Sequence, residues 1–239
     1  MQRDPKDPLL VFPRGSFSAR FVRREKRFRV EVETQEGRTW VHCNNSGSML
    51  GLLRPGSPVL VSPAPGRGRI LAHTLELIRV GGIWVGVNTL VPNRVLRVAW
   101  EMGLLPELEG CDSFQNEARS GDSRLDARIR GAAGTVWVEA KNVTLVENET
   151  AYFPDAATTR GQKHLRELAA LTRCGDRCAC FYLIQRQDAR CFSPADFIDP
   201  AFAEIFWKAL DAGVEVWPYQ ARVSPEGIGL GPRLPLSKR

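Results

Sequence analysis

The sequence predicts an α+β protein in which a small β-barrel of the OB kind precedes an α/β domain, a mixed sheet flanked by helices. Short strand patterns separated by turn residues fill the first third of the chain, whereas longer strands alternate with helical patterns after it. The 239 residues, 43% of them hydrophobic, are enough for two modest domains or one large one, and they exclude a mainly disordered chain.

The first third is expected to form the barrel. Residues 27–33 alternate strictly, with Phe28, Val30 and Val32 on one face and charged side chains on the other, as in a half-buried strand. The expected strands are residues 27–33, 39–43, 58–62, 70–80 and 83–87. Five strands of this length favour an OB or SH3 barrel, with a fragment of a β-sandwich as the alternative. We assign residues 1–82 to this domain.

After the barrel, the spacing of apolar residues changes from the alternation of strands to the spacing of a helix. Pro92, an apolar stripe and Gly103 predict a helix over residues 92–102 that bridges two domains. Further strands are expected at residues 124–130, 135–141, 143–147, 151–153, 179–185 and 214–219, and helices at 159–173 and 200–212. We assign residues 83–239 to this second domain.

The positive charge is concentrated near the N-terminus. Of the net charge of +6, residues 1–82 hold 14 Lys and Arg against 7 Asp and Glu, and residues 83–239 hold 19 against 20. Cations interleaved with phenylalanines suit a nucleic acid, because cations neutralise phosphates and aromatic rings stack on unpaired bases. The alternative is a solvated strand edge with its phenylalanines in the core. The candidate nucleic-acid contacts are Arg14, Arg20, Arg23, Arg24, Lys26, Arg27 and Arg29, joined by Arg160 and Lys163 at the start of a predicted helix.

Neither a membrane span nor a secretory signal is expected. The longest uncharged apolar stretches fall short of the roughly 20 residues that a span requires. The six cysteines show no paired framework, which favours reduced thiols. These features predict a cytoplasmic protein without a membrane partner.

Three residues, Asp126, Glu139 and Lys141, form the candidate catalytic group. Glu139 and Lys141 are two apart in a predicted strand and therefore share a face. If Asp126 lies on the neighbouring strand, its carboxylate joins Glu139 in a hard-oxygen site for Mg²⁺ or Mn²⁺, with Lys141 beside the attacking water. Glu117 is a further candidate carboxylate. The D-x12-E-x-K spacing resembles the motif of the PD-(D/E)xK nucleases, and the alternative is an exposed salt bridge between Glu139 and Lys141.

Further motifs resemble one family closely. They are PR at residues 13–14, HCNNSGSM at 42–49, GVNT at 86–89, PNR at 92–94, SRLD at 123–126, VEAKNVTL at 138–145, FPDA at 153–156 and TRGQKHL at 159–165. Together they are similar to the sugar fermentation stimulation protein A (SfsA) family, over residues 9–230. Asn44 and Ser46 depart from the family's usual proline and threonine.

The resemblance implies an N-terminal OB-like domain, a C-terminal domain of PD-(D/E)xK nuclease type, and DNA as partner. Asp126, Glu139 and Lys141 match the nuclease-like triad, and Glu117 matches an acidic position before it. The family is associated with expression of sugar-utilisation genes.

We therefore predict a DNA-binding protein with a Mg²⁺-dependent or Mn²⁺-dependent phosphodiester site of nuclease type. The alternatives are a non-catalytic DNA-binding regulator of sugar-utilisation genes and an RNA-binding protein, since OB surfaces accept either nucleic acid. The sequence does not fix the oligomeric state, and a homodimer is one option.

Overall fold

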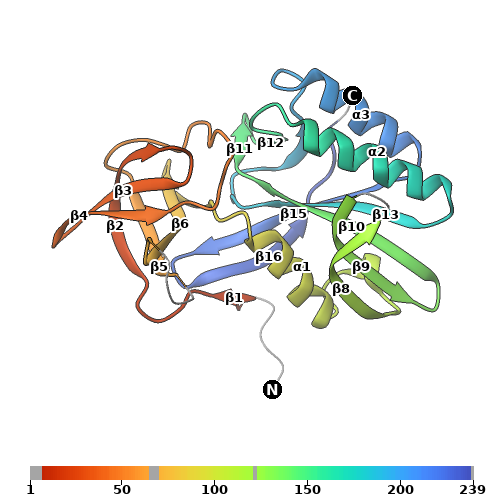
Figure 1. The fold of residues 1–239 in the computed structure, drawn as a ribbon, viewed down its shortest axis with the longest axis horizontal. Coiled ribbons are helices and arrows are strands. Elements are labelled where there is room, and N and C mark those ends of the chain that lie inside the picture. The colour runs from red at the N-terminus through yellow and green to blue at the C-terminus, as the bar shows by residue number, and fades with distance from the viewer. Residues whose placement is uncertain (1–6, 65–69, 121–122, 238–239) are drawn as a thin grey trace.

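A computed structural model describes residues 7–64, 70–120 and 123–237. In these residues the chain forms a barrel next to a layered α/β part (Figure 1). The predicted order, barrel first and sheet with helices second, is present.

The barrel has five strands. They are β2 (Phe17–Glu25), β3 (Arg29–Thr34), β4 (Gly37–His42), β5 (Pro58–Pro63) and β6 (His73–Val80). Their order is β4-β3-β2-β5-β6, and a parallel bridge between His42 and Thr74 closes the ring. Val30 and Val32 are fully buried inside it, as their alternation predicts. Phe28 instead lies in the turn before β3 and is 47% exposed, so its assignment to the buried face was wrong.

The second part is a mixed seven-stranded sheet. Its strands, in spatial order, are β1 (Leu10–Val11), β16 (Gly227–Arg233), β15 (Glu215–Ser224), β13 (Arg177–Ile184), β10 (Gly134–Val143), β9 (Ser123–Gly131) and β8 (Cys111–Ser120). The central strands β10, β13 and β15 run parallel, and the outer pairs are antiparallel. A small sheet follows, made of β11 (Leu145–Glu147), β12 (Thr150–Phe153) and β14 (Cys191–Pro194).

Helices cover both faces of the large sheet (Figure 1). Helix α1 (Val91–Glu101) packs on one face, and α2 (Thr159–Arg173) and α3 (Pro200–Asp211) pack on the other. A short 3₁₀ helix spans Pro106–Leu108. Because β10 alternates between these faces, Val138 points to the α1 side and Trp137 to the α2 side.

The predicted boundary between residues 82 and 83 stays a proposal. Strand β7 (Ile83–Gly86) extends the barrel sheet beyond it by pairing with β6, while β1 lies before it and pairs with β16 in the large sheet.

Side chains of the barrel and of the large sheet pack together in one hydrophobic cluster. Leu60 and Leu77 of the barrel belong to the same hydrophobic cluster as Val138. Gly86 donates its backbone N–H to the carbonyl of Gln185 at 3.0 Å, and a Cβ at position 86 would lie 2.0 Å from Gln185 Oε1. A side chain at position 86 would force the fully buried Gln185 side chain to move.

A second junction involves Asp155, which follows β12. Its Oδ2 accepts a hydrogen bond from the backbone N–H of Met49 at 2.8 Å, and Ser48 Oγ donates to its carbonyl. Gly47 lies so close that a Cβ there would be 2.5 Å from Asp155 Oδ1. The barrel loop at residues 44–49 is therefore fixed against the second part.

Replacing Asp155 by alanine is expected to lower the free energy of unfolding by about 1–3 kcal/mol, because Met49 loses a charge-assisted hydrogen bond. For a chain of this size the melting temperature falls by roughly 2–4 °C per kcal/mol, measured by scanning calorimetry. Asp196→Ala is the matched control, since Asp196 is exposed and bonds only the next residue, Phe197, among the contacts described. Equal melting temperatures for both variants would contradict the assigned role of Asp155.

Candidate metal and nucleic-acid site

Asp126 is held by two elements. It lies on β9 just beyond the last backbone pair with β10, Ala127 with Val138. Its Oδ2 accepts from the backbone N–H of Ala140, and its Oδ1 accepts from Asn93 Nδ2 of α1, both at 2.9 Å. Burial, and secondly the charge of Glu139, raise the pKa of Asp126 above its usual value. The carboxylate thus continues the strand pairing, near enough to Glu139 for that charge to act on its pKa.

Glu139 is the most buried charged group of the site, at 2% exposure. It points toward α2, where its Oε1 contacts Lys141 Nζ and His164 Nδ1. Burial acts to raise its pKa, but Lys141 and His164 outweigh this effect, so that the pKa of Glu139 is lowered. Its Oε2 is buried and has no hydrogen-bond partner among the described residues. One carboxylate oxygen is therefore left open to a ligand.

Lys141 shares the face of Glu139, as the two-residue spacing requires, and the pair is a partly buried salt bridge, with the two side chains 19% and 3% exposed. The exposed surface pair weighed as the alternative is therefore not what forms. Lys141 also borders a cleft of 420 Å³ between the two parts of the molecule.

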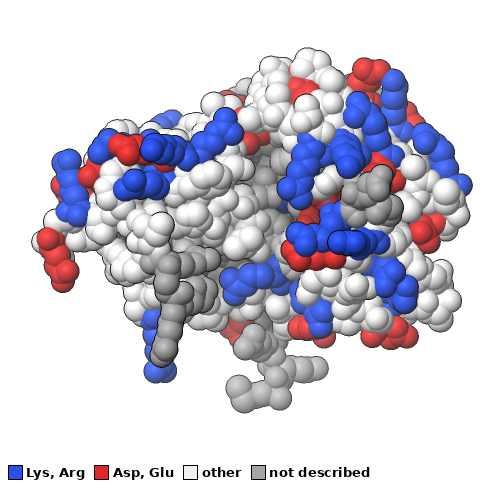
Figure 2. Space-filling model, in the orientation of Figure 1, with Lys and Arg blue, Asp and Glu red and all other residues white. Residues whose placement is uncertain are grey.

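The cleft is lined mainly by polar residues. Arg27 enters it from the barrel turn, Arg160 from the start of α2, and Lys141 from β10, with Asp155 as the acidic residue. Figure 2 shows Lys and Arg side chains on the barrel and beside α2, on either side of the hollow between them. This lining favours an anionic ligand that reaches both parts.

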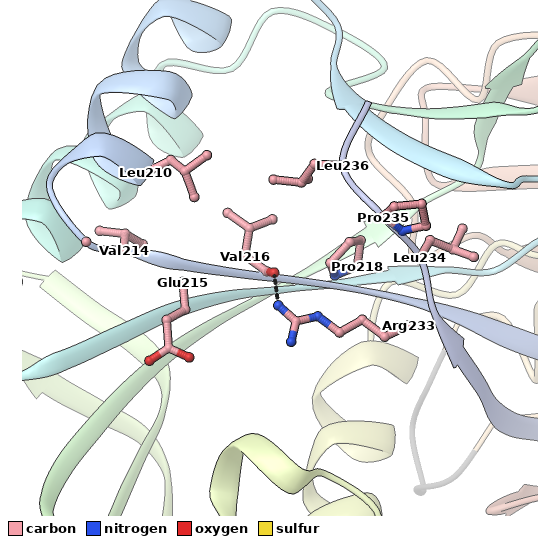
Figure 3. A pocket seen from close by; sticks show the side chains of 10 residues that line it. Leu210, Val214, Glu215, Val216, Pro218, Arg233, Leu234, Pro235 and Leu236 are labelled. Carbon is pink, nitrogen blue, oxygen red and sulfur yellow. Dashed lines mark hydrogen bonds between the residues drawn. The ribbon is translucent and has the colours of Figure 1, made fainter. Parts of the chain in front are cut away.

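A larger cavity of 710 Å³ lies elsewhere, between the end of α3, β15 and the C-terminal segment (Figure 3). Leu210, Val216 and Leu236 give it an apolar wall, and Arg233 in it donates to the carbonyl of Val216 at 2.8 Å. None of the predicted site residues lines it, whereas Lys141, Arg27 and Arg160 line the smaller cleft.

The structure does not gather Glu117 with the other carboxylates. Glu117 lies on β8 across from Asp126, but its side chain is 62% exposed and pairs with Arg124 at 3.4 Å. Within residues 7–64, 70–120 and 123–237, no three His, Cys, Asp or Glu side chains form a metal-binding group. The supporting role of Glu117 stays a prediction.

The predicted basic contacts divide into two groups. Arg24 donates to the carbonyls of Arg27, Gly47 and Asn45 and thereby holds the barrel loop. Arg23 pairs with Glu31 at 2.7 Å and with Glu25. The remaining candidates are exposed, namely Arg14, Arg20, Lys26, Arg27, Arg29, Arg160 and Lys163. Their contact with nucleic acid remains a prediction, whereas Arg24 is occupied within the protein.

The first turn of α2 departs from its prediction as a phosphate-binding turn. Thr158 caps the helix by accepting from Gly161 N–H at 3.0 Å. Gln162 donates to Asp199 at 3.0 Å, and His164 is buried against Glu139. The two candidate nucleic-acid contacts here, Arg160 and Lys163, are both exposed. His164 thus supports a carboxylate, a role that sequence reasoning missed.

Asn93 is the second missed residue. Its amide donates to Asp126 Oδ1. The sequence offers only one signal for this role, a polar residue in the first turn of α1. Asn88 lies before the same helix, where its Oδ1 accepts from Leu90 N–H at 3.1 Å and its Nδ2 donates to Glu76 at 2.9 Å.

The cysteines and helices bear on two further predictions. All six cysteines are free thiols, and burial raises the pKa of Cys178 to about 11 and that of Cys180 to about 12. In the described part of the chain, no helix has the length and apolarity that a membrane crossing needs.

Comparisons with known proteins agree on a family. The model described as "SfsA N-terminal OB domain" matches residues 22–87, and the model described as "Sugar fermentation stimulation protein RE domain" matches residues 90–227. The sugar fermentation stimulation protein homolog of Syntrophobacter fumaroxidans is 63% identical over 231 residues, covering 96% of this chain and 88% of that protein. The homolog of Maridesulfovibrio salexigens is 51% identical over 234 residues, covering 97% and 98%.

A solved structure has the same fold. The Pyrococcus furiosus SfsA in complex with Ca²⁺ superposes with a TM-score of 0.90 at 30% sequence identity, covering 97% of this chain and 100% of that chain. The predicted fold class, an OB-like barrel followed by a nuclease-like domain with a mixed sheet and flanking helices, is confirmed.

Proposed function

The chain belongs to the sugar fermentation stimulation protein (SfsA) family, and on that premise we propose that it binds DNA and holds a divalent cation at a phosphodiester-cleaving site. The observation that carries this proposal is the buried, unpaired Glu139 Oε2, on a carboxylate that raises the pKa of Asp126 and pairs with Lys141, a residue of the cation-lined cleft.

The residues fit a hard cation. Carboxylate oxygens are the ligands that Mg²⁺, Mn²⁺ and Ca²⁺ prefer, and a cation would compensate the otherwise unpaired Glu139 Oε2. The related Pyrococcus furiosus protein has been solved in complex with Ca²⁺. Asp126 and Glu139 would hold the ion, with remaining positions left for water and a phosphate oxygen. When bound, the ion neutralises phosphate charge and acidifies water.

The surrounding residues have separate tasks in this proposal. Asn93 and the Ala140 N–H fix the Asp126 carboxylate, and His164 fixes Glu139 through Oε1. Lys141 orients the attacking water near the phosphate and accepts or supplies a proton at Nζ. Arg27 and Arg160, from opposite sides of the cleft, bind the flanking phosphates.

The non-catalytic DNA binder is the second candidate. It is favoured by one observation, that Glu117 is turned to Arg124 and leaves two carboxylates at the site. Such a protein would use the ion as a clamp for phosphate.

Cleavage assays separate the two candidates. Purified protein is incubated with labelled linear duplex, nicked duplex, single-stranded DNA and single-stranded RNA, in Mg²⁺, Mn²⁺ or EDTA. The proposal expects DNA cleavage with either metal and none in EDTA. Lys141→Ala is expected to lower the cleavage rate by about 10²-fold, the lower range for loss of an acid–base group, with DNA affinity in EDTA retained.

The matched control is Lys208→Ala, because Lys208 also pairs with a glutamate, Glu204, but is exposed on α3. DNA binding without cleavage under every condition would favour the non-catalytic regulator. Preferential binding of RNA would favour the RNA-binding alternative.

A further inference from the structure

One aromatic side chain of the basic region stays outside every core. Of the four phenylalanines interleaved with the N-terminal cations, Phe21 is buried, and Phe12 and Phe17 are half-buried. Phe28, at the tip of the β2–β3 turn, is 47% exposed and lies parallel to His42, with ring centroids 6.3 Å apart and an interplanar angle of 9°. An exposed aromatic ring at a turn does not contribute to the barrel core, so its surface is available to a ligand.

The same ring borders a concave site. A pocket of 550 Å³ is lined by Phe28, Arg29, His42, Ile70 and Leu71. We call it the Phe28 pocket. It combines flat ring faces and apolar side chains with one guanidinium, that of Arg29, which lies 4.6 Å from the centre of the Trp40 ring. In the described part of the chain Arg29 forms no ion pair, and Glu25, its cross-strand neighbour on β2, pairs with Arg23.

The Phe28 pocket and the cleft are lined by neighbouring residues of one turn. Arg27, the residue before Phe28, lines the cleft, and Arg160 lines it from α2. A DNA backbone that crosses the cleft along Arg27 and Arg160 would reach the turn that carries Phe28. The next base of that strand would then be the group nearest to the Phe28 pocket.

The side chains of the Phe28 pocket favour an unpaired base over a base in an intact duplex. A nucleobase presents a flat face to Phe28 and His42 while its phosphate meets Arg29. In an intact duplex both faces of each base are covered by stacked neighbours, so such insertion requires an unpaired base. An apolar peptide or a lipid tail would gain nothing from the surrounding cations.

We propose that the Phe28 pocket binds an unpaired base of the strand whose backbone occupies the cleft, so that the preferred substrate class is DNA with a single-stranded segment. This inference rests on the proposed function, because it takes DNA as the ligand of the cleft.

Binding assays with the full chain in EDTA test the inference. Fluorescence anisotropy compares a labelled single strand, the same strand with abasic sites, and a blunt duplex of equal length. The wild-type protein is expected to bind the intact strand about tenfold more tightly than the abasic strand, the loss typical of one stacked base. Phe28→Ala is expected to lose about the same factor on the intact strand and nothing on the duplex.

Two substitutions at one position separate stacking from apolar filling. Phe28→Tyr should restore single-strand affinity, whereas Phe28→Leu should not. Met102→Ala is the control for loss of an exposed apolar side chain, since Met102 is 38% exposed at the far end of α1. The intact-versus-abasic comparison uses the wild-type chain and needs no variant to fold.

The outcomes distinguish this inference from the proposed function. Equal affinity for intact and abasic strands, or a Phe28→Ala variant that binds single strands normally, would overturn the inference while DNA binding itself stands. Failure of the wild-type protein to bind any of the three DNAs would overturn the proposed function and the inference with it.

Discussion

Asp126→Ala is expected to abolish binding of Mg²⁺ or Mn²⁺ while DNA affinity in EDTA is retained. The variant removes one of the two candidate metal-binding carboxylates and leaves only Glu139, and a single carboxylate holds such ions weakly in water. The candidate DNA-binding cations lie on the barrel and at the start of α2, and they are not altered. Isothermal titration calorimetry measures the metal, and anisotropy in EDTA measures the DNA.

The matched control is Asp112→Ala, because Asp112 is an exposed aspartate on β8 of the same sheet. Asp112→Ala should take up metal as the wild-type protein does. Uptake of a divalent ion by Asp126→Ala, or no uptake by the wild-type protein even with DNA present, would remove the proposed metal site. The non-catalytic DNA binder would then be the better account.

DNA affinity is expected to fall steeply with salt. Each phosphate neutralised contributes a slope of about −0.7 to −0.9 to the plot of log affinity against log salt, so that about six contacts cost roughly 10³-fold between 50 and 200 mM. The seven exposed candidate cations are enough for such a number. Anisotropy titrations at several NaCl concentrations, in EDTA, give the slope.

A triple variant locates these contacts. Lys26→Ala, Arg27→Ala and Arg29→Ala together should make the slope shallower by about 2 to 3. Arg24 is left intact because it holds the barrel loop. A control triple of Arg38→Ala, Arg54→Ala and Arg79→Ala removes the same charge from other parts of the barrel. Salt-independent binding, or equal slopes for the two triples, would contradict this DNA interface.

The elements with a clean hydrophobic period were predictable, and strands with an interrupted or mostly exposed pattern were not. Helix α2 has the expected bounds, Thr159–Arg173. Strand β2 was missed because arginines fill its outer face and a register shift between Phe21 and Arg23 interrupts its alternation. Strand β8 was missed because it is mostly exposed and reads as a polar loop.

The candidate site was predictable where spacing along a strand, or pairing with the adjacent strand, determines which side chains lie close together. The two-residue spacing brings Glu139 and Lys141 together, and the adjacent strand brings Asp126. Asn93 and His164 could not be assigned, because their contacts depend on how α1 and α2 pack on opposite sides of β10. No pattern in the sequence contains that packing.

Gly86 has a consequence for engineering this protein. A side chain there would collide with Gln185, and Leu60 and Leu77 contribute to the core beneath the large sheet. Cutting the chain after residue 82 would strip β7 from the barrel and leave apolar surface open on both fragments. The barrel therefore cannot be exchanged as an independent unit. A chimera that joins it to another domain needs a small residue at position 86 and an apolar surface that packs against Leu60 and Leu77.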